Sequence, residues 1–436
     1  MLYSLISGLF CLALRLFYRC QYIGVELPSD GPVLLVANHP NGLIDPVMLM
    51  DRAHRPVRFL GKAPLFEMPV IGWLMTQLKC LPVYRSQDGQ GTGGNQSTFA
   101  AVSAALNKGE VVCLFPEGIS HDEPQLQPLK TGAARMAFDA LFAAPETEPI
   151  QIVPVGLHYS DKSIFRTQAT ALVGHSFSID DDLAGLFAED PRGAVLELTG
   201  RIDAAIRDVT LNLDDWTQLA ALEIARQLDP GDAEVVSLLN LAQAERVLAH
   251  AQPVRLKQLK NQLVEFKADI DWLGLSMADV RSESSTVSPP AMAISAAGRL
   301  FALALVALVG IIAYAIPYFS VRLVERLKPV DRDVVATVKL LSGMLFFTCW
   351  QVFLGIVCAW TGGTTGLIFS LTLPFFGYLA LLWIERKDAY WRRCLYALLA
   401  LHSPKLLARL HARRRQIETE LDALALYLQN SSEQRR

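Results

Sequence analysis

Two short and fully apolar runs, at residues 33–36 and 111–114, constrain the fold of this chain most strongly. An apolar run of this length, bounded by turn-forming or polar residues, is typical of a strand that is buried on both faces of a sheet. His39 follows the first run closely, and Glu117 and Gly118 follow the second. Open α/β sheets build their sites beyond the carboxyl ends of their strands. The sequence therefore predicts an α/β domain with chemically capable side chains at one edge of its sheet.

His39 and Asp45 form a candidate catalytic pair in this region. An imidazole can take a proton from a hydroxyl near neutral pH, and a nearby carboxylate can hold the second ring nitrogen and stabilise the imidazolium that forms. No serine or cysteine stands next to His39, so the expected nucleophile is a hydroxyl of the substrate, which would attack an activated acyl group. Asp45 also precedes Pro46, a common pattern at a helix N-cap, and this second interpretation does not exclude the first.

Four motifs follow one another along the first half of the chain, at residues 38–46, 81–85, 115–122 and 152–156. Together with residues 61–66, they resemble the motifs of the glycerophospholipid acyltransferases, the family that contains lysophosphatidate and glycerol-3-phosphate acyltransferases. The resemblance covers residues 33–174. Five residues separate His39 from Asp45, where the family usually has four. This HxxxxxD spacing resembles the fungal-type branch of glycerol-3-phosphate/dihydroxyacetone-phosphate acyltransferases.

The resemblance implies a role for each matching residue. His39 would be the general base, Asp45 its partner, and Arg85 the ligand of the acceptor's phosphate, since a guanidinium offers a planar fork of donors. Residues 117 and 118 would position the acceptor near the developing oxyanion. In most of the family an arginine follows the third motif; here Lys130 could supply that cation, or be a solvated lysine at a helix start. The expected substrate-binding residues are Lys62, Arg85, Glu117, Gly118, Ser120 and Lys130.

The motifs and the periodicity of the apolar residues give an expected fold class and domain order. The fold class is α/β, with a mixed sheet flanked by helices as in glycerol-3-phosphate acyltransferases, a helical insertion and C-terminal transmembrane helices. We expect a membrane-associating N-terminal helix at 1–20, the catalytic domain at 21–210, a helical region at 211–280, a linker at 281–299, membrane segments at 300–385 and a basic cytosolic C-terminal helix at 386–436. Strands are expected at 33–37, 57–60, 81–83, 111–115, 152–157 and 169–174, and helices notably at 99–107 and 132–142.

Three apolar segments, at residues 300–319, 340–360 and 367–384, are each about the 20 residues that a membrane span needs. The uncharged turn at 361–364 predicts a hairpin at 340–384, and both flanks of this hairpin are basic. The positive-inside rule therefore places both flanks in the cytosol, with the catalytic domain. A full crossing by 300–319 would conflict with that arrangement, so Gly310 and Pro317 suggest a re-entrant or interfacial hairpin there.

Composition excludes several classes of protein. Hydrophobic residues make up 52% and charged residues 19%, which favours a membrane-bound chain, and the net charge of −3 gives no indication of nucleic-acid binding. The seven cysteines are scattered, as expected for free thiols in a reducing compartment. His121, Asp122, His158 and His175 could in principle join His39 and Asp45 around a metal, but no zinc-ligand spacing is present, so we expect no metal.

The expected function is that of an acyltransferase in phospholipid synthesis, with no cofactor. It would move a fatty acyl group from acyl-CoA or acyl carrier protein to a hydroxyl of a glycerol phosphate acceptor, with membrane lipids as further partners. Glycerol-3-phosphate, dihydroxyacetone phosphate and lysophosphatidate all fit as acceptors. Two alternatives come from other classes: a catalytically inactive lipid-binding or scaffold protein of the same fold, and a metal-dependent hydrolase that uses His39, Asp45 and His121.

Overall fold

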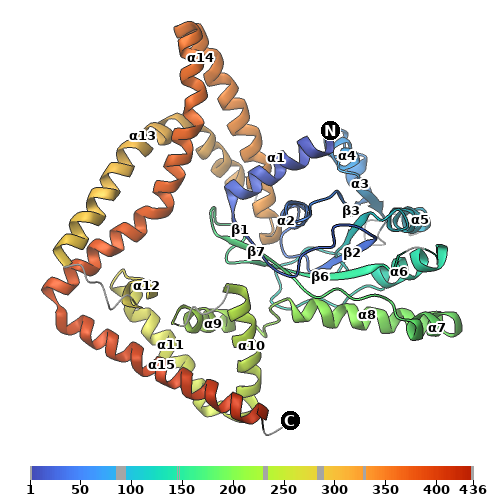
Figure 1. The fold of residues 1–436 in the computed structure, drawn as a ribbon. Helices are drawn as coiled ribbons and strands as arrows, with labels where there is room; N and C mark the ends of the chain where they lie inside the picture. Colours follow the sequence, from blue (N-terminus) through green and yellow to red (C-terminus); the bar gives the residue numbers. More distant parts are fainter. Residues whose placement is uncertain are drawn as a thin grey trace. The chain divides into compact units, whose positions relative to one another are not determined.

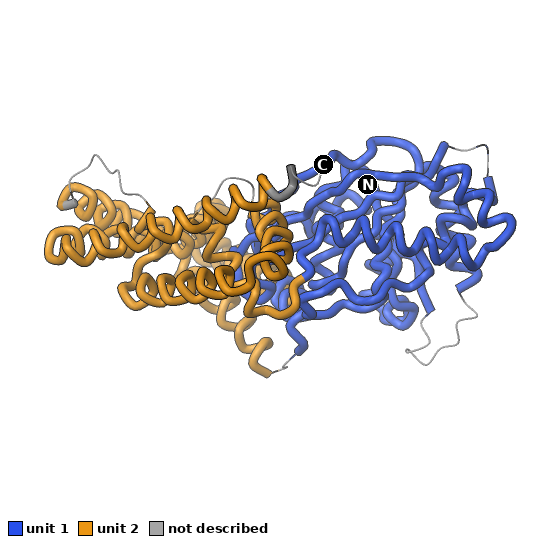
Figure 2. Tube along the Cα trace, turned by 90° about the horizontal axis from the view of Figure 1, so that it is seen from below, with its two compact units in different colours: residues 1–212, 328–341 blue, residues 213–327, 342–436 orange. Residues whose placement is uncertain are grey.

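The computed structural model describes residues 2–84, 95–144, 146, 148–228, 234–281, 289–327 and 330–433. Arg85 and part of the expected linker, residues 282–288, lie outside these described residues. The chain divides into two compact units, which Figure 2 shows in blue and orange. Unit 1 contains residues 1–212 and 328–341, and unit 2 contains residues 213–327 and 342–436. Each unit is thus assembled from two separate stretches of sequence.

A seven-stranded mixed sheet forms the centre of unit 1 (Figure 1). The strands lie in the order β1-β7-β6-β2-β5-β3-β4, and every neighbouring pair is parallel except β6 with β7. Their bounds are Arg19–Gly24, Val33–Ala37, Val57–Lys62, Leu81–Val83, Val111–Leu114, Gln151–Tyr159 and Gln168–Val173, for β1 to β7. The six expected strands and the expected fold class are confirmed. β1 was not expected, because its residues are mixed in polarity and only partly buried.

Helices cover both faces of this sheet. The side chains of Leu34, Val112 and Ile152 point into a core that they share with α5, α6, α7 and α8, while α1 packs against α2. The two expected helices, α5 and α6, are confirmed. The bounds are Leu2–Phe17, Ile44–Arg52, Ala63–Phe66, Pro69–Gln77, Asn95–Leu106, Gly132–Ala143, Asp181–Glu189 and Pro191–Asp208, for α1 to α8.

The start of α2 corrects one interpretation of the sequence. Leu43, not Asp45, is the N-cap residue of α2, and no side chain caps this helix. Asp45 lies inside the first turn, so its carboxylate is available for other partners. The pattern Asp-Pro therefore marks this helix start without supplying its cap.

Unit 2 contains a cluster of helices that joins the middle of the chain to its end. α9 (Trp216–Leu228), α10 (Glu234–Ala251), α11 (Pro253–Trp272) and α12 (Met277–Arg281) pack with α15 (Pro404–Glu433) around a shared apolar core. Ion pairs from Arg413 to Glu265 and Asp269, and from Arg255 to Glu420, join α11 to α15. The partner of the predicted helical region is therefore the C-terminal helix.

Two long apolar helices complete unit 2, α13 (Pro289–Leu327) and α14 (Arg332–His402), whose first ten residues belong to unit 1. Among the described residues, both are long and apolar enough to cross a membrane. α14 is interrupted at Gly363, whose backbone is not helical, so it forms two arms that meet in the expected turn. α13 begins at Pro289, so the second part of the expected linker is helical instead. Residues 386–433 are also divided, between the end of α14 and α15.

Candidate active site

The site begins where strands β2 and β5 end. These strands are parallel neighbours, with Val33 opposite Val111 and Val36 opposite Leu114, so the loops that follow them leave the sheet at the same edge. The backbone N–H of His39 donates to Oε1 of Glu117 at 3.0 Å. The first and third motifs therefore meet at the carboxyl ends of two central strands, as the sequence predicted.

His39 and Asp45 are in direct contact, with Nδ1 of the ring 2.8 Å from Oδ2 of the carboxylate. Asp45 is fully buried, and its oxygens also accept the N–H of Asn41 at 2.7 Å and the hydroxyl of Tyr159 at 2.6 Å. An ionised carboxylate only accepts hydrogen bonds, so Nδ1 carries the ring proton and Nε2 presents its lone pair. The ring stacks on Phe115, with centroids 4.0 Å apart, and this packing fixes its plane.

Tyr159 belongs to the site although the sequence did not single it out. Burial, followed by the charge of Asp45, raises the pKa of its hydroxyl well above the ordinary value, so the hydroxyl stays protonated and donates to the carboxylate. Tyr159 is the last residue of β6, a parallel neighbour of β2. Its place at the end of the strand that carries the fourth motif is the signal that could have identified it.

Glu117 is buried, and its carboxylate is engaged within the chain. Besides the N–H of His39, it accepts the N–H of Gln127 at 2.7 Å and Nε2–H of His121 at 2.5 Å. Nδ1 of His121 in turn accepts the N–H of Glu123 at 3.1 Å. The carboxylate thus ties the backbone of His39 to the loop after β5. Its role in substrate binding stays a prediction.

The other predicted substrate-binding residues lie in different surroundings. Gly118 has φ +75°, which glycine adopts without strain, and its N–H donates to the carbonyl of Phe115 at 2.9 Å, inside the turn. The Lys130 ammonium lies beside it, 2.7 Å from where a Cβ on Gly118 would be. Lys62 is exposed at the end of β3. Arg85 lies outside the described residues, so its predicted role is not tested.

The first turns of α14 contact the loop that carries the catalytic pair. Oγ1 of Thr337 accepts the N–H of Leu43 at 3.1 Å, and Asp333, which is buried, accepts the hydroxyl of Ser120 at 2.5 Å. The carbonyl of Asp333 approaches Gly42 so closely that a Cβ there would come within 3.0 Å, and φ at Gly42 is +41°. A segment that is 294 residues from Leu43 and 213 residues from Ser120 in sequence thus supports both motifs of the site.

The remaining candidate ligands do not assemble around a metal. Among the described residues, no three histidine, cysteine, aspartate or glutamate side chains lie close enough together to hold a metal ion. His158 is half-buried, Nε2 donates to the carbonyl of Val209 at 2.8 Å, and desolvation lowers its pKa to about 4. His175 is exposed.

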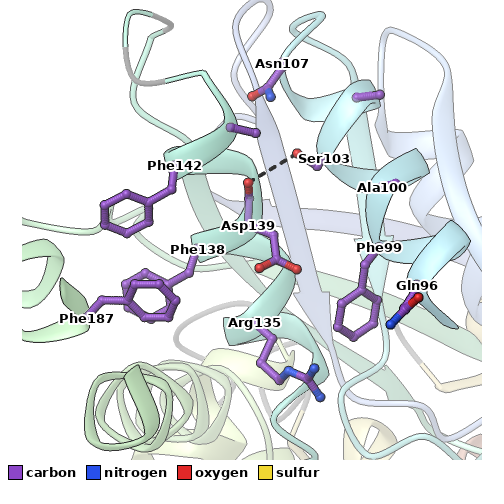
Figure 3. Close-up of a pocket in the computed structure, with 12 residues that line it drawn as sticks. Gln96, Phe99, Ala100, Ser103, Asn107, Arg135, Phe138, Asp139, Phe142 and Phe187 are labelled. Atoms are coloured by element: carbon purple, nitrogen blue, oxygen red, sulfur yellow. Dashed lines mark hydrogen bonds between the residues drawn. The ribbon is translucent and has the colours of Figure 1, made fainter. Parts of the chain in front are cut away.

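A separate cavity of about 800 Å³ lies between α5 and α6 (Figure 3). Phe99, Arg135 and Phe138 line it, with the guanidinium of Arg135 lying 5.0 Å from the centre of the Phe99 ring. None of the predicted site residues lines this cavity. It therefore belongs to the helical layer of unit 1 and not to the site around His39.

Comparison with known proteins agrees with this geometry. The model of the Acyltransferase family matches residues 20–158, which carry strands β2 to β5 and the pair of His39 with Asp45. This stretch of the chain is thus similar to the acyltransferase family. Glycerol-3-phosphate O-acyltransferase 2 of Saccharomyces cerevisiae is 30% identical over 197 residues, which are 44% of this chain and 26% of the yeast protein. The resemblance predicted from the four motifs is thus confirmed.

Two further relatives extend the comparison of the acyltransferase domain. The chloroplastic 1-acyl-sn-glycerol-3-phosphate acyltransferase BAT2 of Brassica napus is 29% identical over 161 residues, which are 36% of this chain and 42% of that protein. The crystal structure of PlsC, the 1-acyl-sn-glycerophosphate acyltransferase of Thermotoga maritima, aligns with 46% of this chain and 80% of PlsC, at 18% identity and a TM-score of 0.32. The chain spans between about a quarter and two-fifths of the length of the curated relatives named here.

Proposed function

We propose that the chain is an O-acyltransferase of phospholipid synthesis, which moves a fatty acyl group from a thioester to a hydroxyl of a glycerol phosphate acceptor. The contact between His39 and Asp45 carries this proposal, because it leaves Nε2 of the ring as a base at the edge of the sheet. The family of the domain and the names of its relatives support the reaction class. The donor would be acyl-CoA or acyl carrier protein, and the acceptor glycerol-3-phosphate or 1-acylglycerol-3-phosphate.

The proposed step needs only the residues described above and the two substrates. Nε2 of His39 takes the proton of the acceptor hydroxyl while the oxygen attacks the thioester carbonyl. Asp45 holds Nδ1–H and stabilises the imidazolium. The tetrahedral intermediate then collapses, the carbon–sulfur bond breaks, and the imidazolium returns its proton to the departing thiolate. No cofactor or metal enters this sequence, and general-base help of this kind contributes about 10²–10⁴-fold in rate.

Cationic side chains near the pair would hold the acceptor's phosphate. Lys130, which lies against Gly118 beside the third motif, is the candidate that the geometry supports most directly. We propose that Arg85 and Lys62 also contribute, with Ser120 positioned by Asp333. Because three hydrogen bonds within the chain already engage the carboxylate of Glu117, its contribution would be to hold these loops in place.

Two tests distinguish this proposal from its alternatives. Purified full-length protein in lipid vesicles, given labelled acyl-CoA and each acceptor in turn, should release free thiol and form labelled product with at least one acceptor. Binding of lipid without thiol release would instead support the inactive scaffold. A metal-dependent hydrolase would release free fatty acid and lose activity in a chelator. Both ring nitrogens of His121 are already engaged within the chain, which argues against the hydrolase.

We also propose that the acyltransferase domain faces the cytoplasm. Acyl-CoA or acyl carrier protein would meet the domain there, and basic residues lie at the two outer ends of the hairpin: Lys339 near the start of the first arm, and Arg386, Lys387, Arg392 and Arg393 near the end of the second. The exposed leucines of α1 would add a second contact with the membrane surface. Antibody or protease access to the domain in intact and in opened cells measures this orientation.

A further inference from the structure

α13 is apolar enough to cross a membrane, yet a single crossing is incompatible with the contacts of unit 1. α13 lies between residues 1–281 and residues 330–341 in the sequence. The second of these stretches contacts the first inside unit 1, through Thr337 with Leu43 and Asp333 with Ser120. If α13 crossed the bilayer once, these partners would lie on opposite sides of it. Both ends of α13 must therefore lie on one side.

The first half of α13 runs beside the second arm of α14, in the opposite direction. Near its start, the carbonyl of Ala293 accepts a contact from Sγ of Cys394 at 3.7 Å. Further along, Gly310 approaches Phe376 so closely that a Cβ would come within 2.1 Å of its carbonyl oxygen. About 17 residues separate the two contacts in each helix, or about 26 Å of helix. The two axes are therefore aligned along this length.

The second half of α13 must return toward the start of α14. If α13 continued straight, Leu327 would lie near the turn at Gly363, about 45 Å of helix away from Arg332. The four residues between Leu327 and Arg332 can span at most about 18 Å. Just beyond Gly310, α13 also meets the first arm: Tyr314 stacks on Phe347, with centroids 5.8 Å apart, while it still packs against Gly377 of the second arm. The helix thus turns between the arms, as its path in Figure 1 shows.

The backbone carbonyl that Pro317 leaves without a partner within α13 accepts a hydrogen bond from α14. Pro317 has no N–H, so the carbonyl four residues earlier, on Ala313, loses its partner within the helix. Nε1–H of Trp350, on the first arm of α14, donates to that carbonyl at 2.7 Å. Satisfying such a group from a neighbouring helix is how helices tolerate proline inside a membrane. The indole N–H therefore replaces the missing backbone N–H as the hydrogen-bond donor to the carbonyl of Ala313.

A short polar network links the three helical segments at the same level. The hydroxyl of Tyr314 donates to Oε1 of Gln351 at 2.5 Å, and Nε2 of Gln351 donates to the carbonyl of Ser370 on the second arm at 3.0 Å. Gln351 lies about 18 Å of helix from Lys339, and Gly377, against which Tyr314 packs, lies about 14 Å from Arg386. Half of the hydrocarbon thickness is about 15 Å. The network therefore lies near the middle of the bilayer if the basic residues mark its surface.

The residues around the start of α13 are those expected at the membrane surface, in agreement with a polar network near the middle of the bilayer. Cys394 follows Arg392 and Arg393, and Trp391 beside them is 64% exposed, as is typical of a residue at the membrane–water interface. Basic residues also flank the apolar part of α13 itself, Arg299 before it and Arg322 and Arg326 after it. Its outward face is apolar, with Phe301, Leu305, Ile312 and Phe319 exposed.

We propose that α13 is a re-entrant membrane element. It enters the bilayer beside the second arm of α14, turns near the midplane between Gly310 and Pro317, and returns to the side from which it came. The hairpin of α14 supports it throughout, and the face that contains Phe301 and Ile312 contacts acyl chains. The catalytic domain, the α9–α12 helices and α15 consequently share one side of the membrane.

Thiol labelling tests the path of α13 in the full-length protein. Single cysteines replace Ile294 near its start, Leu327 at its end and, as a marker of the catalytic side, the exposed Glu189. A membrane-impermeant maleimide is added to sealed vesicles sorted for one orientation. The labelling of the unchanged protein, which has cysteines of its own, is subtracted from that of each variant. We expect I294C and L327C to react in the same vesicles as E189C. If either reacts only after detergent opens the vesicles, α13 crosses the membrane and the proposal is wrong.

A double-mutant cycle tests the turn itself. Trp350→Phe removes the indole N–H that partners Ala313, so it should lower the midpoint of thermal unfolding in detergent, while Trp360→Phe, at an exposed position near Gly363, should not. Pro317→Ala supplies a backbone N–H to the same carbonyl, so W350F should cost clearly less in that background. An equal loss in both backgrounds, or none in either, would contradict the proposed partner of the turn.

Discussion

At the residue scale, the chemistry depends on which nitrogen of His39 carries the proton. Three donors converge on the buried carboxylate of Asp45, from His39, Asn41 and Tyr159. This arrangement holds one tautomer of the ring and leaves its outer nitrogen as the base. The stacked ring of Phe115 further limits its rotation. The pair is thus oriented before any substrate arrives.

His39→Ala should remove this base and lower turnover by about 10²–10⁴-fold, the usual contribution of a general base. The unfolding midpoint should change little, because the ring is not part of the apolar core. Thiol release from acyl-CoA measures turnover directly. His175→Ala, the same substitution at an exposed histidine, is the matched control and should retain full activity. A folded H39A protein with most of its activity would contradict the assigned role.

His158 predicts a pH dependence of stability that is separate from catalysis. Burial lowers its pKa to about 4, below the usual value near 6.5, so the folded state resists protonation. Its contribution to stability is present above pH 6.5 and is lost as the pH falls toward 4, by about 1.4 kcal/mol per pH unit. His158→Gln keeps a donor for the carbonyl of Val209 without titrating. Unfolding midpoints at pH 7 and pH 5 should therefore differ less in H158Q than in the unchanged protein.

At the element scale, the first turns of α14 position the catalytic loop. The loop between His39 and Asp45 has one residue more than is usual in the family, and its Leu43 N–H finds an acceptor in Thr337. Gly42 meets the backbone of Asp333 at the same place. The helix thus compensates for the longer loop, and we expect it to influence catalysis without contacting substrate.

Thr337→Val keeps the size of the side chain but removes the acceptor, leaving the N–H of Leu43 unpaired. We expect kcat to fall severalfold to tenfold, about the cost of one lost hydrogen bond, with KM for acyl-CoA little changed. Thr337→Ser retains the hydroxyl and should restore most of the rate. Steady-state kinetics of the two variants measures this effect. Equal losses in both would point to a packing effect instead of the hydrogen bond.

Sequence reasoning succeeded where a local pattern carries the information. The six expected strands are nearly continuous apolar runs or family motifs, and the contact of His39 with Asp45 follows from their spacing at a strand end. β1 has no such pattern, since its residues are partly exposed at the edge of the sheet. Thr337 and Asp333 reach the site through tertiary packing, which no local spacing in the sequence encodes, whereas the place of Tyr159 at the end of β6 was a usable signal.

At the scale of the whole molecule, exposed apolar surfaces that could meet a membrane occur in both units. α1 buries Ile6, Phe10 and Leu14, while its other side exposes a stripe of leucines at every third or fourth residue: Leu2, Leu5, Leu9, Leu12 and Leu16. The apolar arms of α14 provide a separate and much larger apolar surface. We therefore expect the leucine stripe to place the catalytic domain at the bilayer, and not to anchor the chain.

Replacing Leu5, Leu9 and Leu12 with glutamine should leave the protein in the membrane fraction after alkaline washing, because the hairpin still holds it. Acylation of lysophosphatidate in vesicles should fall more than acylation of soluble glycerol-3-phosphate. The ratio of the two rates measures this effect in an enzyme that acylates both acceptors. Leu186→Gln with Leu196→Gln, at exposed leucines on α7 and α8, should leave the ratio unchanged. An unchanged ratio in the α1 variant would exclude the proposed role of the stripe.

Unit 1, which contains the candidate active site, is built from two stretches of chain, residues 1–212 and 328–341. A recombinant fragment that stopped at Asn212 would lack the hydrogen-bond partners of Leu43 and Ser120. We expect such a fragment to be less stable, even though it contains all four motifs. Splicing the short second piece onto the first through a flexible linker should give a smaller, more soluble enzyme for crystallisation.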